Sequence, residues 1–415
     1  MNIPFNFDKK EIILDIPDKN LLAILEANSI KIEKSEAELV SDSIHKPIAS
    51  DRLKDIVKKG EKIAVITSDI TRPMPSSKVL PFVLEELEKA GIPDEDITIV
   101  FALGNHRSHT RDEMILLVGN TIFDRIRCVD SNGKMVHLGT TAMGTPVDIF
   151  EIVANADRRI CLGNIEYHYF AGYSGGSKAI MPGVSTREAI QSNHSRMVEP
   201  TSKAGKIDGN AVRQDIDSVL NFISIDFIVN VVLNEHKQIV FCVSGDPVLA
   251  HREGCRFLDT LYGITIPQQA DIVVVSPGGF PKDINLYQAQ KALDNAKNAV
   301  KPGGAILWIA SAKEGLGEKH FEEWMLGHDT PDEMISHIQS EFVLGGHKAA
   351  AIALVMKNAE IFLYSDLNAD FVKRIHMNPV TDPQTTLNEL IDRYGPEAKV
   401  VAMPFGGSTL PILKS

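Results

Sequence analysis

The chain has 415 residues, of which 44% are hydrophobic and 24% are charged, and its 43 basic and 55 acidic side chains give a formal net charge of −12. This composition is typical of a globular protein of roughly two or three domains whose core needs neither disulfides nor structural metals. Because the balance is acidic and no basic stripe is present, it argues against nucleic acid or an anionic membrane as the main partner.

The sequence also lacks the usual signals for membrane insertion or export. Its longest apolar runs, such as residues 349–356, are far shorter than the ~18 residues that a membrane-spanning helix needs. The N-terminal residues show no apolar stretch behind a basic start, so we expect no signal peptide and a cytoplasmic protein. The cysteines are scattered without a C-x-x-C pair, which argues against a disulfide framework and a thiolate zinc site; they are Cys128, Cys161, Cys242 and Cys255.

Short β-branched runs alternate with helical patterns, as in parallel strands joined by crossover helices. Residues 77–90 are the clearest helix, with apolar positions at three- and four-residue spacing and Gly91 after its end. The sequence therefore predicts an α/β protein with mainly parallel, Rossmann-like sheets. The expected strands are residues 63–67, 97–103, 159–163, 272–276, 305–310, 361–365 and 400–404.

The alternation is interrupted at residues 223–243, where two apolar runs flank a polar turn, as in a hairpin at a sheet edge. A polar, proline-containing stretch then precedes a new strand, and we place a domain boundary near residue 265. This gives two mixed α/β domains, residues 1–265 and residues 266–415. In the second domain a helical pattern runs from Asp283 to Val300 and is followed by a glycine turn.

Ligands of open α/β sheets bind beyond the carboxyl ends of the strands, so the residues after each expected strand are the first candidates. After residues 159–163 the chain contains Gly172, Gly175 and Gly176, whose backbone N–H groups could approach an anion such as a phosphate. Lys178 adds a positive charge. The segment departs from the P-loop pattern at Ser177, and its alternative interpretation is a glycine turn beside a solvated lysine.

Three further polar residues follow strand ends, Arg72 and His106 after two other strands and His168 after residues 159–163. Arg72 has the planar guanidinium that binds a carboxylate through two N–H groups, although an ordinary surface pair with Asp69 is an alternative. His106 and His168 follow different strands. They could act as acid and base in one crevice near neutral pH, or each could be a hydrogen-bonded structural residue.

Helix spacing gives the remaining candidates. His109 follows His106 by three residues and would share a helix face with it, which is weak evidence for a metal site. His194 has the imidazole of a metal ligand or of an exposed surface residue. One face of the helix expected from Asp283 onward carries further polar side chains that either close a pocket or face water; they are Tyr287, Gln288 and Lys291.

Taken together and in this order, these segments resemble the lactate racemase family, whose members use a nickel-pincer nucleotide. The resemblance covers most of the chain. Asn105 is a departure, because the family more often has threonine there, and the position bears on loop shape and substrate preference. The motifs are D-I-T-R-P (69–73), G-N-H-R (104–107), Y-H-Y-F-A-G-Y-S-G-G-S-K (167–178), His194 and P-K-D-I-N-L-Y-Q-A-Q-K (281–291).

The resemblance implies a role for each of these candidates. Lys178 would carry the cofactor, a pyridinium bis-thiocarboxylic acid mononucleotide with nickel, through a covalent thioamide bond. His194 would be the protein ligand of the nickel, and His106 and His168 would be the acid/base pair. Further cofactor contacts would come from Asp69, Gly172, Ser174, Gly175 and Gly176. Substrate contacts would come from Arg72, Tyr287, Gln288 and Lys291.

The implied reaction is racemisation of a lactate-like 2-hydroxy acid by reversible hydride transfer to the cofactor through a bound 2-keto acid. Hydride removal avoids direct deprotonation beside a carboxylate, for which a histidine is poorly matched in pKa. Two histidines are needed because the two enantiomers present their hydroxyls to opposite sides. An active-site cleft between the two domains would exclude water, and the expected partners are the small substrate and cofactor-assembly enzymes.

Three other functions are compatible with parts of this pattern. A C2 epimerase of a longer hydroxy acid or sugar acid would use the same motif residues, because these handle only the carboxylate and C2. A non-catalytic anion- or nucleotide-binding protein would keep the fold, but the joint presence of His106, His168 and His194 disfavours it. An NAD-dependent dehydrogenase is disfavoured because no G-x-G-x-x-G stands between a strand and a helix.

Overall fold

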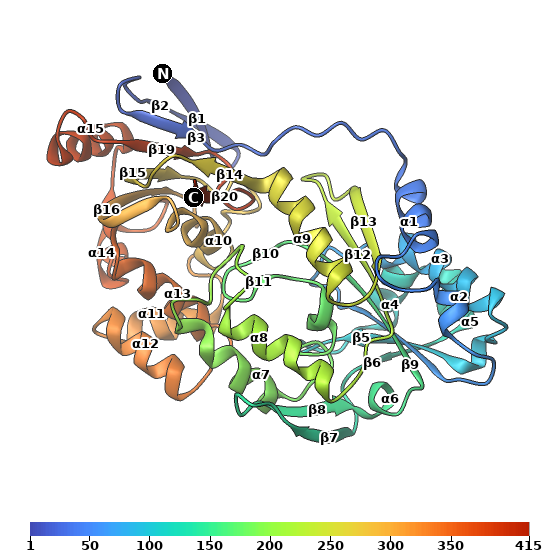
Figure 1. Cartoon of the computed structure of the whole chain (residues 1–415). Coiled ribbons are helices and arrows are strands. Elements are labelled where there is room, and N and C mark those ends of the chain that lie inside the picture. Colours follow the sequence, from blue (N-terminus) through green and yellow to red (C-terminus); the bar gives the residue numbers. More distant parts are fainter. Residues whose placement is uncertain (415) are drawn as a thin grey trace. The chain divides into compact units, whose positions relative to one another are not determined.

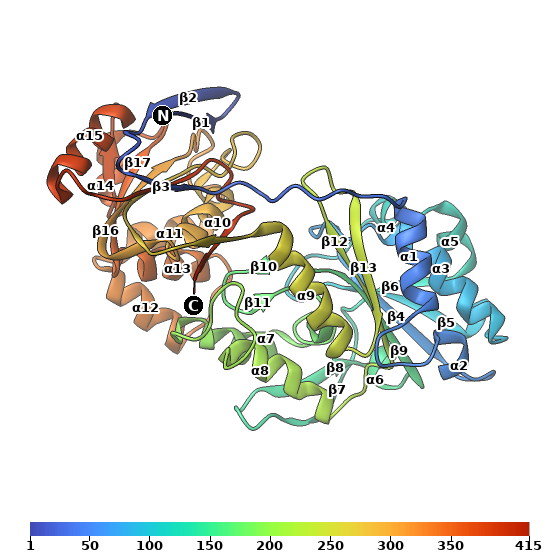
Figure 2. The same cartoon turned by 45° about the horizontal axis from the view of Figure 1, so that its top comes forward.

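The computed structural model describes residues 1–414 and falls into two compact units. One unit comprises residues 30–258, and the other joins residues 1–29 to the chain from Asp259 onward. Figures 1 and 2 show the elements of both units from two directions. The expected domain of residues 1–265 therefore does not coincide with a compact unit, because residues 1–29 belong to the other unit. Among the described residues, no helix is both long and apolar enough to cross a membrane.

A six-stranded sheet forms the centre of the unit of residues 30–258, in the order β13-β12-β9-β4-β5-β6. Neighbouring strands are parallel except β12 and β13, which form the expected antiparallel hairpin at one edge. The inner strands are buried on both faces, which explains their continuous apolar runs. The strands are β4 (Ile63–Ser68), β5 (Ile97–Ala102), β6 (Arg127–Asp130), β9 (Arg158–Asn164), β12 (Phe227–Leu233) and β13 (Ile239–Gly245).

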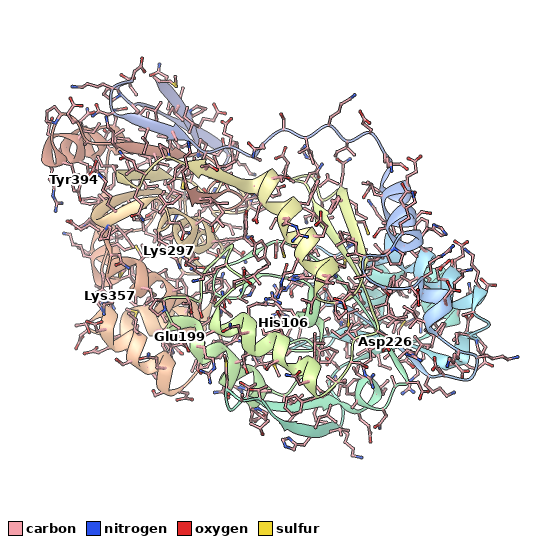
Figure 3. All side chains as sticks on the ribbon, viewed as in Figure 1. His106, Glu199, Asp226, Lys297, Lys357 and Tyr394 are labelled. Atoms are coloured by element: carbon pink, nitrogen blue, oxygen red, sulfur yellow. The ribbon has the colours of Figure 1, made fainter. Side chains whose placement is uncertain are left out.

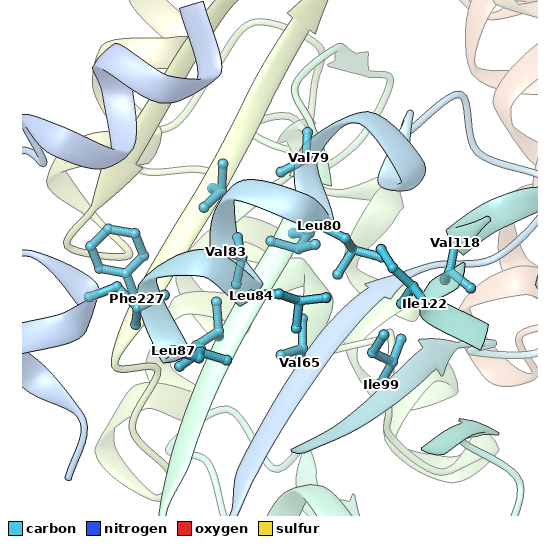
Figure 4. Packing of buried hydrophobic residues seen from close by; sticks show 14 of the residues in the cluster. Val65, Val79, Leu80, Val83, Leu84, Leu87, Ile99, Val118, Ile122 and Phe227 are labelled. Atoms are coloured by element: carbon cyan, nitrogen blue, oxygen red, sulfur yellow. The ribbon is translucent and has the colours of Figure 1, made fainter. Parts of the chain in front are cut away.

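Helix α3 (Ser76–Lys89) packs on this sheet because its apolar residues recur every three or four positions. Val79, Val83 and Leu87 are fully buried. Figure 4 shows them in one cluster with Val65 of β4 and Ile99 of β5. The helix predicted over residues 77–90 is therefore confirmed, with each end one residue earlier.

The remaining elements of this unit are short. Capping boxes begin two helices, because Ser35 caps α1 and Thr110 caps α4. The helices are α1 (Glu36–His45), α2 (Leu53–Ile56), α4 (Arg111–Val118), α5 (Asn120–Arg125), α6 (Glu151–Ala154), α7 (Arg187–His194), α8 (Ala211–Ser218) and α9 (Leu249–Tyr262), the last of which continues into the other unit. The antiparallel hairpins are β7 (Met135–Thr140) with β8 (Pro146–Phe150) and β10 (Tyr167–His168) with β11 (Gly172–Tyr173).

The second unit contains a parallel six-stranded sheet in the order β18-β17-β16-β15-β19-β3. Its edge strand β3 comes from the N-terminus and pairs with β19, which is why residues 1–29 belong to this unit. The strands are β3 (Leu21–Ile24), β15 (Ala270–Val275), β16 (Val300–Ile309), β17 (Ala359–Tyr364), β18 (Asn378–Val380) and β19 (Val400–Met403).

Further strand pairs and helices complete the second unit. The pairs are antiparallel β1 (Asn2–Phe7) with β2 (Lys10–Asp15) and parallel β14 (Gly263–Ile266) with β20 (Leu410–Leu413). The helices are α10 (Leu286–Ala296), α11 (Lys319–Gly327), α12 (Pro331–Ser340), α13 (Gly346–Met356), α14 (Ala369–Arg374) and α15 (Pro383–Tyr394).

The helix expected from Asp283 to Val300 is shorter than predicted. The side chain of Asn285 caps α10 by accepting a hydrogen bond from the Gln288 N–H, so the helix starts after that residue. Asp283 instead accepts hydrogen bonds from the backbone N–H groups of Asp8 and Ser311. The helix ends at Ala296, and the expected glycine turn at residues 301–304 lies within β16.

Candidate active site

Asp69 and His106 meet at the carboxyl ends of two neighbouring strands. Asp69 directly follows β4, and His106 lies in the loop after β5. Because these strands are adjacent and parallel, their ends come together, and Nδ1 of His106 lies 2.7 Å from Oδ2 of Asp69. The carboxylate accepts the Nδ1–H, so Nε2 is the ring atom that carries the lone pair. His106 is labelled in Figure 3.

Asp69 is almost fully buried and still ionised. Burial raises the pKa of its carboxyl group. The hydrogen bonds from His106 and Thr71 and the charge of Arg72 lower that pKa by a larger amount, so the net pKa lies below its usual value. Thr71 Oγ1 donates to Asp69 Oδ1 at 2.9 Å. A buried carboxylate bound to Nδ1 stabilises the imidazolium that forms when Nε2 takes a proton.

His109 is a structural residue. It lies in a loop, where the expected shared helix face with His106 does not exist. Its Nδ1 donates to Asp130 Oδ1 at 2.6 Å, and its Nε2 accepts from the Ile70 N–H at 3.0 Å. With both ring nitrogens engaged, His109 ties the loop after β4 to the end of β6 and does not form a metal-binding pair with His106.

Phe170 lies close to three further residues expected in the site. Its ring centroid lies 4.4 Å from that of His168 and 4.9 Å from that of His194, and Nζ of Lys178 lies 6.0 Å from it. These residues come from the β10/β11 hairpin, from the end of α7 and from the short 3-10 turn Gly176–Ala179. The expected attachment residue, metal ligand and second acid/base residue are therefore neighbours.

His168 is a half-buried histidine that remains neutral. Its pKa lies well below the usual value because the ring is desolvated and because the positive charges of Arg72 and Arg213 are near. The backbone N–H of Ala171 donates to its Nδ1 at 3.3 Å and fixes the ring orientation. The two histidines of the expected acid/base pair thus have different surroundings. His106 is bound to a carboxylate, whereas His168 is desolvated and lies near positive charges.

The surroundings of Lys178 favour its unprotonated amine. Its pKa lies well below the usual value because of burial and the positive charges of Arg213 and Arg72. An unprotonated lysine amine is a nucleophile, whereas the protonated form is not. The charge of the exposed Arg72 side chain also influences the pKa values of Asp69 and His168. Arg72 therefore lies near the Asp69–His106 pair and also near the residues around Phe170.

The glycine-rich segment is packed against the protein. The Gly176 N–H donates to Asn230 Oδ1 at 2.8 Å, and a Cβ there would lie 2.9 Å from the His251 ring. Ser174 Oγ donates to the Asn164 carbonyl at 2.7 Å. Close packing therefore explains these glycines, at least in part. Ser177 Oγ differs, since it is buried and has no hydrogen-bond partner among the described residues.

A hydrogen-bond network that the sequence did not predict binds the backbone carbonyl groups of the glycine-rich segment. Arg213 of α8 is 1% exposed and donates to the carbonyl groups of Ala171 and Tyr173. His251 of α9 donates from Nε2 to the Ser174 carbonyl at 2.7 Å and accepts from Arg252 at Nδ1. Burial and the charges of Arg213 and Arg252 lower the pKa of His251 to about 3, so it stays neutral. The one signal of this network in the sequence is the four-residue spacing of Arg213 and Asp217, which is typical of an ion pair on a helix.

Gly172 gives a direct test of this packing. Its φ is +78°, and a Cβ there would lie 2.0 Å from the Lys206 carbonyl oxygen. We expect Gly172→Ala to lower the free energy of unfolding by about 2–5 kcal/mol, the sum of backbone strain and overpacking. Gly60→Ala is the control, because Gly60 has φ +90° with nothing within 4 Å, and only strain of about 1–2 kcal/mol is expected. Denaturant unfolding measures both, and equal losses would contradict the packing argument.

The substrate candidates on α10 belong to the other unit. Nζ of Lys348 lies 3.8 Å from the Tyr287 ring centroid and donates to the Tyr287 carbonyl, which fixes this turn against α13. Gln288 is exposed, and Tyr287 and Lys291 are half-buried. Spacings of three and four residues place Lys291 on the same helix face as the other two.

Comparisons with known proteins agree with this organisation. Residues 7–205 match the lactate racemase N-terminal domain, and residues 266–410 match the lactate racemase C-terminal domain. The chain is 31% identical to the lactate racemase of Thermoanaerobacterium thermosaccharolyticum over 422 residues, 99% of each chain. It is 31% identical to that of Lactiplantibacillus plantarum over 417 residues, 97% of this chain and 98% of the relative.

The chain belongs to the lactate racemase family. Solved structures support the same assignment. The lactate racemase apoprotein from T. thermosaccharolyticum matches with a TM-score of 0.89 and 30% identity over 100% of both chains. A Thermotoga maritima protein matches with a TM-score of 0.61 and 17% identity over 91% of this chain and 97% of its own, which shows a shared fold.

Family membership confirms several of the expectations from the sequence. The chain is an enzyme of the isomerase class, a racemase, with two mixed α/β domains and mainly parallel sheets. The lactate racemase family implies a nickel-dependent cofactor. The roles of the individual site residues rest on the geometry above and are treated as proposals below.

A polar cavity of about 420 Å³ opens beside His106 in the unit of residues 30–258. Its wall includes Asn105, where the resemblance led us to expect threonine, together with Arg107, Asn132 and Arg187. Residue 105 therefore lines a cavity beside an expected acid/base residue.

Proposed function

We propose that this enzyme racemises lactate or a lactate-like 2-hydroxy acid by reversible hydride transfer to a nickel-pincer nucleotide bound covalently at Lys178. The observation that carries the proposal is the grouping of Lys178, His168 and His194 around Phe170. The surroundings of two of these residues suit the proposed roles. The lowered pKa of Lys178 favours its nucleophilic, unprotonated amine, and His194 donates from Nδ1, so its lone pair is at Nε2.

The residues present fit such a cofactor. Ser177 Oγ is a buried hydroxyl without a protein partner among residues 1–414, and it directly precedes Lys178, so a bound ligand would satisfy it. We propose that Lys178 Nζ forms the covalent bond and that His194 Nε2 is the protein ligand of the nickel. Asp69, Gly172, Ser174, Gly175 and Gly176 are proposed to shape the cofactor site. When bound, the nucleotide supplies a reversible acceptor for the α-hydrogen, taken as hydride.

The histidines of this chain handle the hydroxyl proton. His106 takes it at Nε2, and the ionised Asp69 carboxylate at Nδ1 stabilises the resulting imidazolium. Loss of the hydroxyl proton together with the α-hydrogen leaves a bound 2-keto acid, and return of both to the opposite face gives the other enantiomer. His168 is proposed as the second proton-exchanging residue: when one histidine takes the hydroxyl proton of one enantiomer, the other, in its protonated form, returns a proton to the oxygen of the opposite enantiomer.

The substrate carboxylate needs a cationic partner. We propose that Arg72 binds it through its guanidinium, because the exposed side chain lies within electrostatic reach of Asp69 and His168. We also propose that Tyr287, Gln288 and Lys291 of α10 contact the substrate, an assignment that rests on the family motif. Cofactor-assembly enzymes are the proposed protein partners.

A second candidate function is C2 epimerisation of a longer hydroxy acid or sugar acid with the same cofactor. The polar cavity beside His106 favours it, because its wall of Asn105, Asn132 and two arginines offers hydrogen bonds to substituents beyond C3. The reaction at C2 would be unchanged, and only the non-reacting part of the substrate would differ.

The experiment that tests the proposed function uses protein produced together with cofactor-assembly enzymes. It is incubated separately with D- and L-lactate and with a panel of longer 2-hydroxy acids, and the products are separated by chiral chromatography. We expect each lactate enantiomer to give a racemic mixture. Activity only on longer acids would establish the epimerase alternative. Nickel-loaded protein that interconverts none of these acids would overturn the proposal.

A further inference from the structure

A buried chain of polar side chains stands behind His194. Asn193 is 0% exposed, and its Oδ1 lies 3.0 Å from Nδ1 of His194. Its amide nitrogen donates to Asp215 Oδ2 at 2.8 Å and to the Val212 carbonyl at 3.2 Å. Since both neighbours of Nδ2 are acceptors, the orientation of the Asn193 amide is fixed, and Oδ1 must face the histidine.

Asp215 fixes the direction of these hydrogen bonds. Its side chain is 1% exposed and accepts from Thr141 Oγ1 and Thr145 Oγ1, each at 2.6 Å, as well as from Asn193. In each of these contacts the Asp215 oxygen accepts and the neighbour donates. Among residues 1–414 Asp215 has no ion-pair partner, so neutral donors alone satisfy its buried oxygens.

The direction of the chain determines the state of the histidine. Asp215 and the Val212 carbonyl accept from Asn193 Nδ2 and hold it on their side, which turns Asn193 Oδ1 towards His194 as an acceptor. Nδ1 of His194 must then carry a hydrogen. In a neutral imidazole this leaves the lone pair at Nε2, and a metal-bound histidine needs one nitrogen in that state.

We propose that Asp215 and Asn193 are positioning residues that set the tautomer of His194 and make Nε2 its metal-binding nitrogen. This inference rests on the proposed function, in which His194 is the protein ligand of the nickel. It extends the site to the turn between β7 and β8, which supplies Thr141 and Thr145. All of these residues lie in the unit of residues 30–258, as does His194.

The test compares variants of the cofactor-loaded protein. In Asn193→Ala the acceptor is lost, and we expect nickel retention against a chelator to fall about 10–100-fold, the usual effect of removing a group that orients a metal ligand. The absorption spectrum of the bound cofactor should also shift, because the imidazole ligand is no longer held. Unfolding of the cofactor-free variant reports on the fold separately.

An exchange of the two side chains provides a rescue. Asn193→Asp alone places two carboxylates side by side and should weaken nickel retention and stability together. In Asn193→Asp combined with Asp215→Asn, residue 193 again accepts from His194 Nδ1 and residue 215 donates to it. We expect this double variant to regain most of the nickel retention and the original spectrum, which a purely structural role would not require.

Asn20→Ala is the matched control. Asn20 is also 0% exposed and donates from Nδ2 to two backbone carbonyls, those of Pro396 and Ala398, but it lies in the other unit. Its replacement should lower stability without changing nickel retention or the spectrum. If Asn193→Ala keeps wild-type nickel retention and spectrum, the inference is overturned while the proposed function stands. If the wild type carries no nickel, the proposed function itself fails.

Discussion

Replacing either His106 or His168 by alanine is expected to lower the rate of racemisation about 10²–10⁴-fold, the range for loss of a positioned acid/base group. Both directions should be affected, because each turnover removes a proton on one side of the substrate and returns it on the other. The fold should survive, since His106 is 30% exposed and neither ring lies in the central sheet. Initial rates from D- and L-lactate, measured by chiral chromatography, give the result.

Two further variants sharpen this experiment. Asp69→Asn keeps His106 but removes the charge that stabilises its imidazolium and lets an amide N–H face Nδ1, which favours the wrong tautomer, so we expect a loss of up to about 10⁴-fold. His137→Ala is the control, because Nδ1 of His137 lies 2.6 Å from Asp148 Oδ1 in the same kind of pair, but the side chain is 61% exposed and outside the site. Full activity in the double variant of His106 and His168 would refute the assigned pair.

Replacing Lys178 by methionine is expected to abolish both the covalent cofactor and the activity. Methionine has about the size of lysine without its amine, so it fills the same space and cannot form the bond. Protein produced with the assembly enzymes should then have the mass of the bare polypeptide, measured by mass spectrometry of the intact chain. Lys203→Met is the control, since that side chain is exposed, and it should keep the mass increment.

The same variant should stabilise the cofactor-free protein at neutral pH. Because the pKa of Lys178 is lowered in the folded state, folding favours the unprotonated amine, and stability is lost as the pH falls below the unfolded value of about 10.4. The gain of Lys178→Met over the wild type should therefore shrink as the pH is raised towards 10. A mass increment that persists in Lys178→Met would show that the cofactor is attached elsewhere.

The sequence predicted the larger elements because their signals are local. Helix α3 follows from its apolar spacing, and β4, β5 and β15 follow from β-branched runs that are buried on both faces. The predicted start of α10 was wrong because a tertiary contact determines where this helix begins. Asp283 looks like a helix start in sequence but binds backbone N–H groups of Asp8 and Ser311, and Asn285 takes the capping position.

The candidate site was found through motifs, and the interpretation of some residues changed in three dimensions. His109 has the spacing of a metal-binding residue but is engaged at both ring nitrogens. The glycines suggested a phosphate cradle, yet Gly176 donates to Asn230 and packs on His251. Neither Asn230 nor His251 could be predicted, because each is more than fifty residues distant in sequence from the glycine it touches.

By itself, the order of residues determined the α/β class and the longer strands and pointed to the candidate reactive side chains, because hydrophobic periodicity and side-chain chemistry are properties of short segments. Only the tertiary structure decided their protonation and orientation. The pKa values of Lys178 and His168 are lowered because desolvation and the charges of Arg72 and Arg213 act on them, and Asn193 turns its Oδ1 towards Nδ1 of His194 because its Nδ2 donates to Asp215 and Val212. Electrostatic energy depends on distance in space and on burial, and neither is written in the spacing of residues along the chain.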